Sequence, residues 1–434
     1  MNKKLMALAV AGALSAPAAA LAQVQIGGSL QLLYFQHDPD NKNSGSAGST
    51  NQVGVPGTQT TDVMQSSESE LLIRGSEKLG GGLEVWFQCA TSIDGIFNGN
   101  SATTAGMCTR NSALGFKGGF GNVFAGNWDT PLKLVQNRIR GWFSGTNALY
   151  GGGYTLLAGG SSSGAANAVQ TVAASPVIGG TTGAATANGG AAANSFYRRQ
   201  ANSVNYQSPD WGGFSVAAAF SANNESSGIP DSVGLTPRLY GINGVYAAGP
   251  LWVGVGYESH TDYNPGQTAI GAGVSQYNGG TDSNYSIGAG YTFAGTINVR
   301  ATYSSSKYEV TNSSDLKVKG YGFYGDWQIA GPHALHLAFI TSDDTKGSTS
   351  QNVGSYKGPG SSGCGPTSTS SCSGSTGGDV FTIAYSYDFS KRTQLFFAYN
   401  EMKNDSNATF SQGVVASSAG GKQKSIGLGL KHSF

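Results

Sequence analysis

The sequence contains little charge, and no long hydrophobic run follows its first residues. Only 11% of its 434 residues are charged, whereas soluble globular domains carry about 25%. Beyond residue 22, no apolar stretch reaches the roughly 20 residues that a membrane-spanning helix needs. With a net charge of +1 and no basic run, nothing suggests nucleic acid as a partner. The composition therefore argues against an ordinary soluble domain and against a helical membrane protein.

Cysteine and histidine are also scarce. The five histidines are scattered, and His333 and His336 are interpreted as strand or turn residues. Since neither residue type shows the spacing of a metal site or a catalytic centre, we expect no enzyme activity, metal or cofactor.

The four cysteines are even in number, and four cysteines permit three connectivities. Disulfides are plausible in an exported protein. We favour Cys89 with Cys108 and Cys364 with Cys372, because each pair would close a short loop.

The first residues have the features of a secretory signal peptide. Lys3 and Lys4 precede an apolar run at residues 5–14, and small residues end at Ala22. This run is too short to span a bilayer as a helix. We therefore expect cleavage after Ala22, leaving one exported domain at residues 23–434.

Strand-like alternation is the main pattern in the rest of the chain. Near the end, Ile426, Leu428 and Leu430 alternate with Gly427 and Gly429. Successive strand side chains point to opposite faces, so this strand would have one apolar and one small or polar face. The pattern recurs at residues 285–293, 297–304 and 380–389. In a soluble sandwich the apolar face would be a core, whereas in a barrel it would face lipid.

The joints between these strands alternate between short and long. Seven short and eight long joints imply about sixteen strands, an even number with both termini on the short-turn side. The sequence therefore predicts an all-β fold, a transmembrane antiparallel β-barrel, and about 16 strands leave an aqueous channel. The longest joint, residues 127–197, contains a Gly, Ala and Ser tract at 151–193. It is interpreted either as a flexible surface loop or as a loop folded into the barrel, and the fold prediction adopts the second.

Residues 69–85, reading SELLIRGSEKLGGGLEV, resemble the second hairpin of the trimeric general porins of Gram-negative bacteria, of the neisserial and betaproteobacterial type. Further segments agree in the same order, at residues 110–126, 201–214, 387–399 and 426–434. The resemblance implies a multi-pass homotrimer in the outer membrane, among lipid and lipopolysaccharide, with pores constricted by the third loop. It also implies that Phe434 is read by the outer-membrane assembly machinery.

The resemblance makes charged wall and loop residues the candidates for the pore lining and constriction. Arg199 shares the parity of Ser203 and should face the lumen, whereas Arg110 shares that of Leu114 and should lie above the lipid unless a bulge intervenes. Arg300 falls on the polar face of its strand. The candidates are Glu70, Arg74, Arg110, Lys133, Arg138, Arg140, Arg199 and Arg300.

Two positions depart from the family pattern, where many members have arginine in place of Glu70 and Asn127. Glu70 could form a wall ion pair with Arg74 or affect ion selectivity. In the loop, Asp129 is the only acid, whereas Lys133, Arg138 and Arg140 are basic. A loop with this excess of basic residues would favour anions.

Three functions remain open. The first is a passive pore for small hydrophilic solutes and ions, weakly anion-selective, or a more solute-specific channel. The second is a barrel-anchored surface adhesin acting through its long loops. The third is an outer-membrane hydrolase, which would need a serine and a histidine on adjacent lipid-facing strands.

Overall fold

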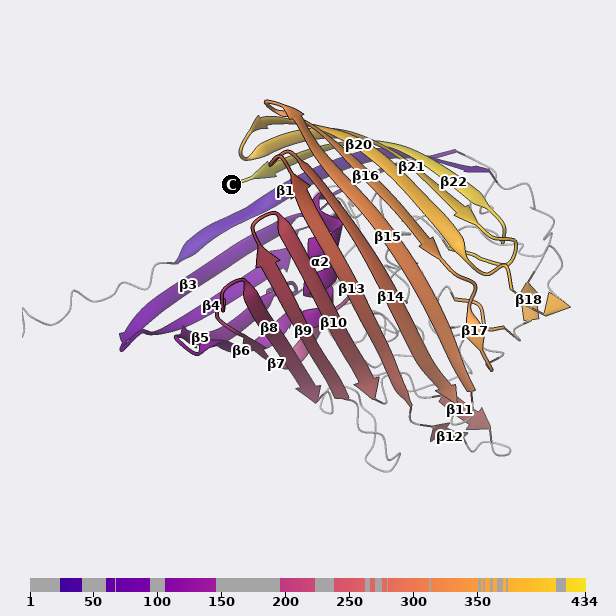
Figure 1. The fold of residues 1–434 in the computed structure, drawn as a ribbon, viewed down its shortest axis with the longest axis horizontal. Coiled ribbons are helices and arrows are strands. Elements are labelled where there is room, and N and C mark those ends of the chain that lie inside the picture. Colours follow the sequence, from indigo (N-terminus) through magenta and orange to yellow (C-terminus); the bar gives the residue numbers. More distant parts are fainter. Residues whose placement is uncertain are drawn as a thin grey trace, which may run out of the picture.

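The chain forms one closed antiparallel barrel of sixteen long strands in a computed structural model (Figure 1). The structure describes residues 24–40, 60–66, 68–93, 106–145, 196–222, 238–261, 266–269, 275–278, 280–311, 314–349, 353, 356–359, 362–364, 370–371, 374–410 and 419–434. The expected signal peptide, residues 1–22, lies outside them.

The strands follow the chain order around the barrel. The sixteen are β1 (Gln25–Asp40), β3 (Glu70–Gly80), β4 (Leu83–Ser92), β5 (Ser112–Gly118), β6 (Gly121–Asp129), β7 (Arg199–Gln207), β8 (Phe214–Ala222), β9 (Arg238–Ala248), β10 (Leu251–Thr261), β13 (Thr281–Phe293), β14 (Ile297–Thr311), β15 (Ser314–Ala330), β16 (His333–Ser342), β20 (Gly378–Ser390), β21 (Thr393–Asn404) and β22 (Lys422–Ser433). Two short segments, β2 (Thr61–Gln65) and β17 (Lys346–Gly347), extend the sheet beside β1 and β15. The pairs β11 (Gly266–Ala269) with β12 (Ser275–Asn278) and β18 (Ser362–Cys364) with β19 (Ser370–Ser371) are separate hairpins.

The first and last strands close the barrel. β1 pairs with β22 from Ser29 opposite Ser433 to Asp40 opposite Lys422. At the end of this seam, Gly28 and Phe434 exchange two backbone hydrogen bonds of 3.1 and 3.2 Å. Closure pairs the strand edges, as a sheet in hydrocarbon requires, because each unpaired backbone group there costs several kcal/mol.

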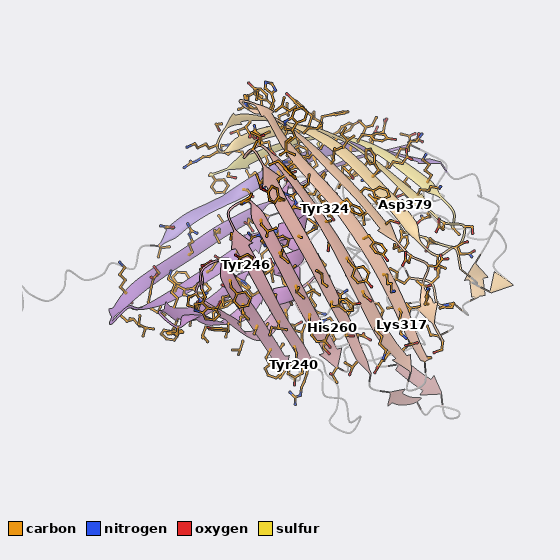
Figure 2. All side chains as sticks on the ribbon, viewed as in Figure 1. Tyr240, Tyr246, His260, Lys317, Tyr324 and Asp379 are labelled. Carbon is orange, nitrogen blue, oxygen red and sulfur yellow. A yellow bond between two sulfur atoms is a disulfide. The ribbon has the colours of Figure 1, made fainter. Side chains whose placement is uncertain are left out.

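The outer face of the strands is apolar and the inner face is small or polar, as the alternation predicted. On β13, Tyr285, Ile287 and Tyr291 are exposed on the outside, while Asn284 and Ser286 are buried inside. Tyr240 and Tyr246 lie near opposite ends of β9 and are also exposed (Figure 2). Aromatic side chains at both ends of strands are typical of the interfacial girdles of membrane barrels. None of the described helices is long and apolar enough to span a bilayer.

Short turns join the strands at one end of the barrel, and longer connections join them at the other, except that only two residues separate β14 from β15, where a long joint was expected. The predicted short joints coincide with turns, for example between β3 and β4, where Gly81 and Gly82 have φ of +59° and +81°. Glycine adopts such angles without steric cost. We call these the short-turn end and the long-loop end. Gln25, the first residue of β1, and Ser433, the last residue of β22, both lie at the short-turn end. In outer-membrane barrels short turns face the periplasm and long loops face outward.

The third loop begins with a helix that lies inside the barrel. Helix α2 (Pro131–Arg140) is followed by the 3-10 helix η2 (Gly141–Gly145). Thr130 caps α2 by accepting a hydrogen bond from the backbone of Lys133, and Pro131 opens it, as helix starts favour. The predicted inward fold is therefore confirmed for this part. The Gly-rich tract at 151–193 lies outside the described residues.

A disulfide joins Cys89 of β4 to Cys108 in the segment before β5, with a Cα–Cα distance of 4.6 Å. This is the pairing favoured from the sequence. The side chains of the other expected pair, Cys364 and Cys372, lie outside the described part of the chain.

Reduction of this disulfide should be visible on a denaturing gel. The bond spans a sequence separation of 19, and closing such a loop stabilises a fold by about 3 kcal/mol. Unfolded protein should migrate faster without reductant, and Cys89→Ser should remove part or all of that shift. A shift of unchanged size in Cys89→Ser would assign it to the other cysteines instead.

Candidate functional site

Helix α2 lies against one side of the inner wall, where glycines leave room for its side chains. Leu132 packs over Gly256 of β10 and Ile139 over Gly288 of β13. A Cβ at Gly288 would lie 2.4 Å from Ile139, so a larger residue there would force the helix away from the wall. The helix contacts β8, β9, β10, β13 and β14, and in the strand order β22, β1 and β3 form the opposite side. The helix therefore narrows the lumen from one side.

Arg110 and two glutamates form the first part of a charged cluster at the long-loop end. The guanidinium of Arg110 lies 2.5 Å from Glu68 and 3.0 Å from Glu70. Burial alone would raise the pKa of the Glu68 carboxyl. Arg110 beside it, with Arg199 and Lys133 further away, nevertheless holds that pKa below its usual range. These neighbours place Arg110 at the inner wall.

One expectation about these residues was wrong, and one of the two alternatives for Glu70 is excluded. Arg110 does not lie above the lipid, because it precedes β5 in an irregular segment where Cys108 has φ of +63° and strand parity does not apply. Glu70 pairs with Arg110 and not with Arg74, whose Nε donates to Gln25 at 2.9 Å. Residues four apart on a strand are about 13 Å apart, too far for an ion pair.

Asp129 organises the second part of the cluster, where the third loop leaves β6. One carboxylate oxygen lies 2.6 Å from Lys133 of α2 and 3.2 Å from Arg199 of β7. The other accepts a hydrogen bond of 3.0 Å from Asn111, whose own amide oxygen accepts from Arg199. The side chain of Asp129 is only 9% exposed. Thus Arg199 does reach the inner wall, as predicted.

These two parts together form the balanced cluster, with as many basic as acidic side chains. Its members are Arg110, Lys133, Arg199, Glu68, Glu70 and Asp129. Each basic group contacts at least one acid. The balanced cluster therefore contributes little net charge to the lumen, and an excess of either sign must come from residues outside it.

Arg74 and Arg138 are such residues. Arg74 is opposite the inward-facing Gln88 on β4 and is exposed. Arg138 is exposed on α2, with its guanidinium 5.0 Å from the centre of the Trp252 ring. Among the described residues, no acid lies within ion-pair distance of either arginine. β3 and α2 are on opposite sides of the barrel, so both sides carry a positive charge.

Arg140 and Arg300 hold the third loop in place. Arg140 donates to the Tyr197 hydroxyl at 2.7 Å and to the Phe143 carbonyl at 2.8 Å, and it is buried. Arg300 donates to the carbonyl of Ile139 at 2.6 Å and forms an ion pair with Asp326. A cation at the last turn of a helix also interacts favourably with the helix dipole. Both residues therefore hold the third loop in place, and neither guanidinium is free to interact with ions in the lumen.

His336 completes the attachment of the loop. It lies 2.6 Å from Asp326, and its ring stacks on Trp142 of η2 with centroids 4.1 Å apart. We call Arg300, Asp326, His336 and Trp142 the loop clamp. In the sequence, His336 was interpreted only as a strand or turn residue. Its shared parity with Ala334 and Ala338 could have indicated that it faces the lumen, but no sequence pattern identifies Trp142 as its partner.

The structure thus brings four of the eight predicted charged residues into one cluster, Glu70, Arg110, Lys133 and Arg199. Glu68, Asn111 and Asp326 were missed. Within the described ranges, no group of three His, Cys, Asp or Glu side chains could hold a metal ion.

Comparisons with known proteins agree with this architecture. A family model described as Gram-negative porin matches residues 7–407. Outer membrane porin protein 32 of Delftia acidovorans is 23% identical over the whole of both chains. The major outer membrane protein P.IB of Neisseria lactamica is 28% identical over 33% of this chain and 38% of its own length.

Solved structures show the same fold. The anion-selective porin from Comamonas acidovorans superimposes with a TM-score of 0.63 at 19% identity, covering 95% of this chain and all of its own. OmpT of Vibrio cholerae gives a TM-score of 0.57 at 13% identity, covering 95% of this chain and 97% of its own. The family match extends over most of the chain, and the barrel and inward loop agree with it. The chain therefore belongs to the Gram-negative porin family.

Proposed function

We propose that this outer-membrane porin lets small hydrophilic solutes and ions diffuse passively, with a weak preference for anions. The observation that carries the preference is the distribution of charge on the inner wall. The acids of the balanced cluster are all paired, whereas Arg74 and Arg138 have no acid within ion-pair distance among the described residues. Fixed charges in a narrow pore bias which ions enter. The similar Comamonas protein is named an anion-selective porin.

Removing the positive charges of Arg74 and Arg138 should weaken the preference for anions. Arg74→Gln combined with Arg138→Gln takes away two positive charges and breaks no ion pair seen in the described residues. We expect the anion-to-cation permeability ratio to fall roughly twofold to fivefold, measured as a reversal potential across a planar bilayer in a salt gradient.

The control is Lys319→Gln, an exposed cation of β15 whose neighbours Val318 and Gly320 face inward. It should leave the ratio unchanged. An equal effect of the control and the double variant would show that surface charge, and not the lumen, sets the preference.

The assembled form follows from the same family membership. We propose a homotrimer among outer-membrane lipid and lipopolysaccharide, since a trimer form is named for the similar OmpT of Vibrio cholerae. Phe434 is the proposed signal for the assembly machinery. It follows β22 directly, its ring is half exposed, and its backbone makes the two bonds to Gly28. Sedimentation of the purified protein in detergent distinguishes a trimer from a monomer. The family favours a channel without catalytic activity.

A further inference from the structure

A cavity of about 680 Å³ lies at the short-turn end, next to Trp142 of the loop clamp. One side is formed by η2 of the third loop. The other is formed by the turn between β20 and β21 and by the end of β22. Solutes that have passed the third loop would reach this cavity before they leave the barrel. We call it the short-turn cavity.

Three basic side chains line the short-turn cavity, Lys391, Arg392 and Lys431. None of them has an acid within ion-pair distance among the described residues. The ammonium of Lys431 lies beside Gly145, 3.1 Å from the position that a Cβ would take there. Three such charges around one cavity create a positive potential that low-dielectric walls strengthen.

The one acid in the lining is held by other groups. Asp388 accepts a hydrogen bond of 2.7 Å from the Gln394 amide nitrogen. The Gln394 oxygen in turn accepts a bond of 2.9 Å from the Trp142 indole. These two hydrogen bonds fix η2 to the wall and engage one carboxylate oxygen of Asp388. The lining therefore keeps an excess of positive charge.

Hydroxyl groups accompany the basic side chains. Ser144, Ser390 and Ser433 also line the short-turn cavity. Ammonium, guanidinium and hydroxyl donors match anions that carry several oxygen acceptors. A doubly charged anion interacts with each cation twice as strongly as chloride does at the same distance. The lining thus suits small multivalent oxyanions better than monovalent ions.

We propose that the short-turn cavity is a binding site for small multivalent oxyanions that carry phosphate or carboxylate groups, such as inorganic phosphate. The proposal deepens the proposed function, on which it rests, because it adds a step on the periplasmic side of an anion-conducting pore. A bound oxyanion there would slow chloride passage.

The test is phosphate inhibition of chloride current through single channels in a planar bilayer. Potassium phosphate replaces potassium acetate at equal ionic strength on one side at a time. The orientation of the channels is read from the reaction of Pro250→Cys, in the β9–β10 turn, with an impermeant maleimide. Phosphate should inhibit from the short-turn side at a lower concentration than from the long-loop side.

A pair of matched variants assigns the effect to residues. Lys391→Gln with Lys431→Gln should raise the half-inhibiting phosphate concentration roughly tenfold. Lys78→Gln with Lys117→Gln removes two positive charges at the same end, on β3 and β5. This control should leave the half-inhibiting concentration unchanged. Equal shifts in both double variants, or equal inhibition from both sides, would overturn the proposal.

Calorimetry separates this proposal from the pore itself. Phosphate should bind the purified protein in detergent, and binding should be roughly tenfold weaker in the Lys391 and Lys431 variant. A conducting channel without measurable phosphate binding overturns the site and leaves the proposed function standing. Phosphate binding to a protein that gives no current would instead reject the pore and keep the site.

Discussion

Arg300→Gln should release the end of α2 from the barrel wall. The Arg300 guanidinium caps the Ile139 carbonyl and pairs with Asp326, and the two side chains are only 9% and 22% exposed. Removing one partner of a buried ion pair costs about 3–5 kcal/mol. We expect the free energy of unfolding to fall by about 3 kcal/mol and single-channel conductance to rise with more noise. Urea unfolding and bilayer recording measure the two effects.

The matched control for this variant is Lys307→Gln on the same strand. Lys307 pairs with Glu309, but the two side chains are 42% and 39% exposed. Exposed pairs contribute less than about 1 kcal/mol. If Arg300→Gln matched this control in both stability and conductance, the loop clamp would not hold the third loop.

Asp129→Asn should have the second large effect, on both selectivity and stability. The carboxylate is the acid that Lys133 and Arg199 share at 2.6 and 3.2 Å. Without its charge, two largely buried cations lose their nearest acid, which costs about 3 kcal/mol. The balanced cluster gains one net positive charge. Reversal potentials in a salt gradient should therefore shift toward stronger anion preference.

A second substitution tests the cause of that shift. Asp129→Asn combined with Lys133→Gln restores the neutral balance of the cluster, so selectivity should return toward that of the unmodified protein. Glu84→Gln is the control, since its pair with Lys117 is partly exposed and its stability effect should be small. A shift of Asp129→Asn toward cations would contradict the charge account.

The sequence predicted the barrel because strand periodicity is a local property. The apolar faces of β13 and β22 and the positions of the short turns could be read directly, since side chains of a strand alternate with a period of two. Arg199 also reaches the inner wall, but not through regular parity, because the β6–β7 register shifts opposite residues 200–203 and Asn202 has a φ of +51°. Parity failed for Arg110, which follows a disulfide-bonded residue with positive φ.

The contacts of the third loop could not be predicted in this way. Arg140 and Arg300 had the same basic side chains in the sequence as Arg138, yet the structure uses them to hold the loop while Arg138 stays exposed. The difference depends on tertiary contacts, since Arg140 bonds Tyr197, 57 residues away, and Arg300 bonds the Ile139 carbonyl, 161 residues away. A local pattern contains no information on such distant neighbours.

A recording of the unmodified protein tests most directly whether the barrel is an open pore with a positive lumen. The purified protein is added to a planar bilayer with a potassium chloride gradient. We predict stepwise conductance increases and a reversal potential with the sign of chloride preference. A barrel without steps would be a plugged surface protein such as an adhesin. Steps with potassium preference would contradict the assignment of Arg74 and Arg138 as the charges that set selectivity.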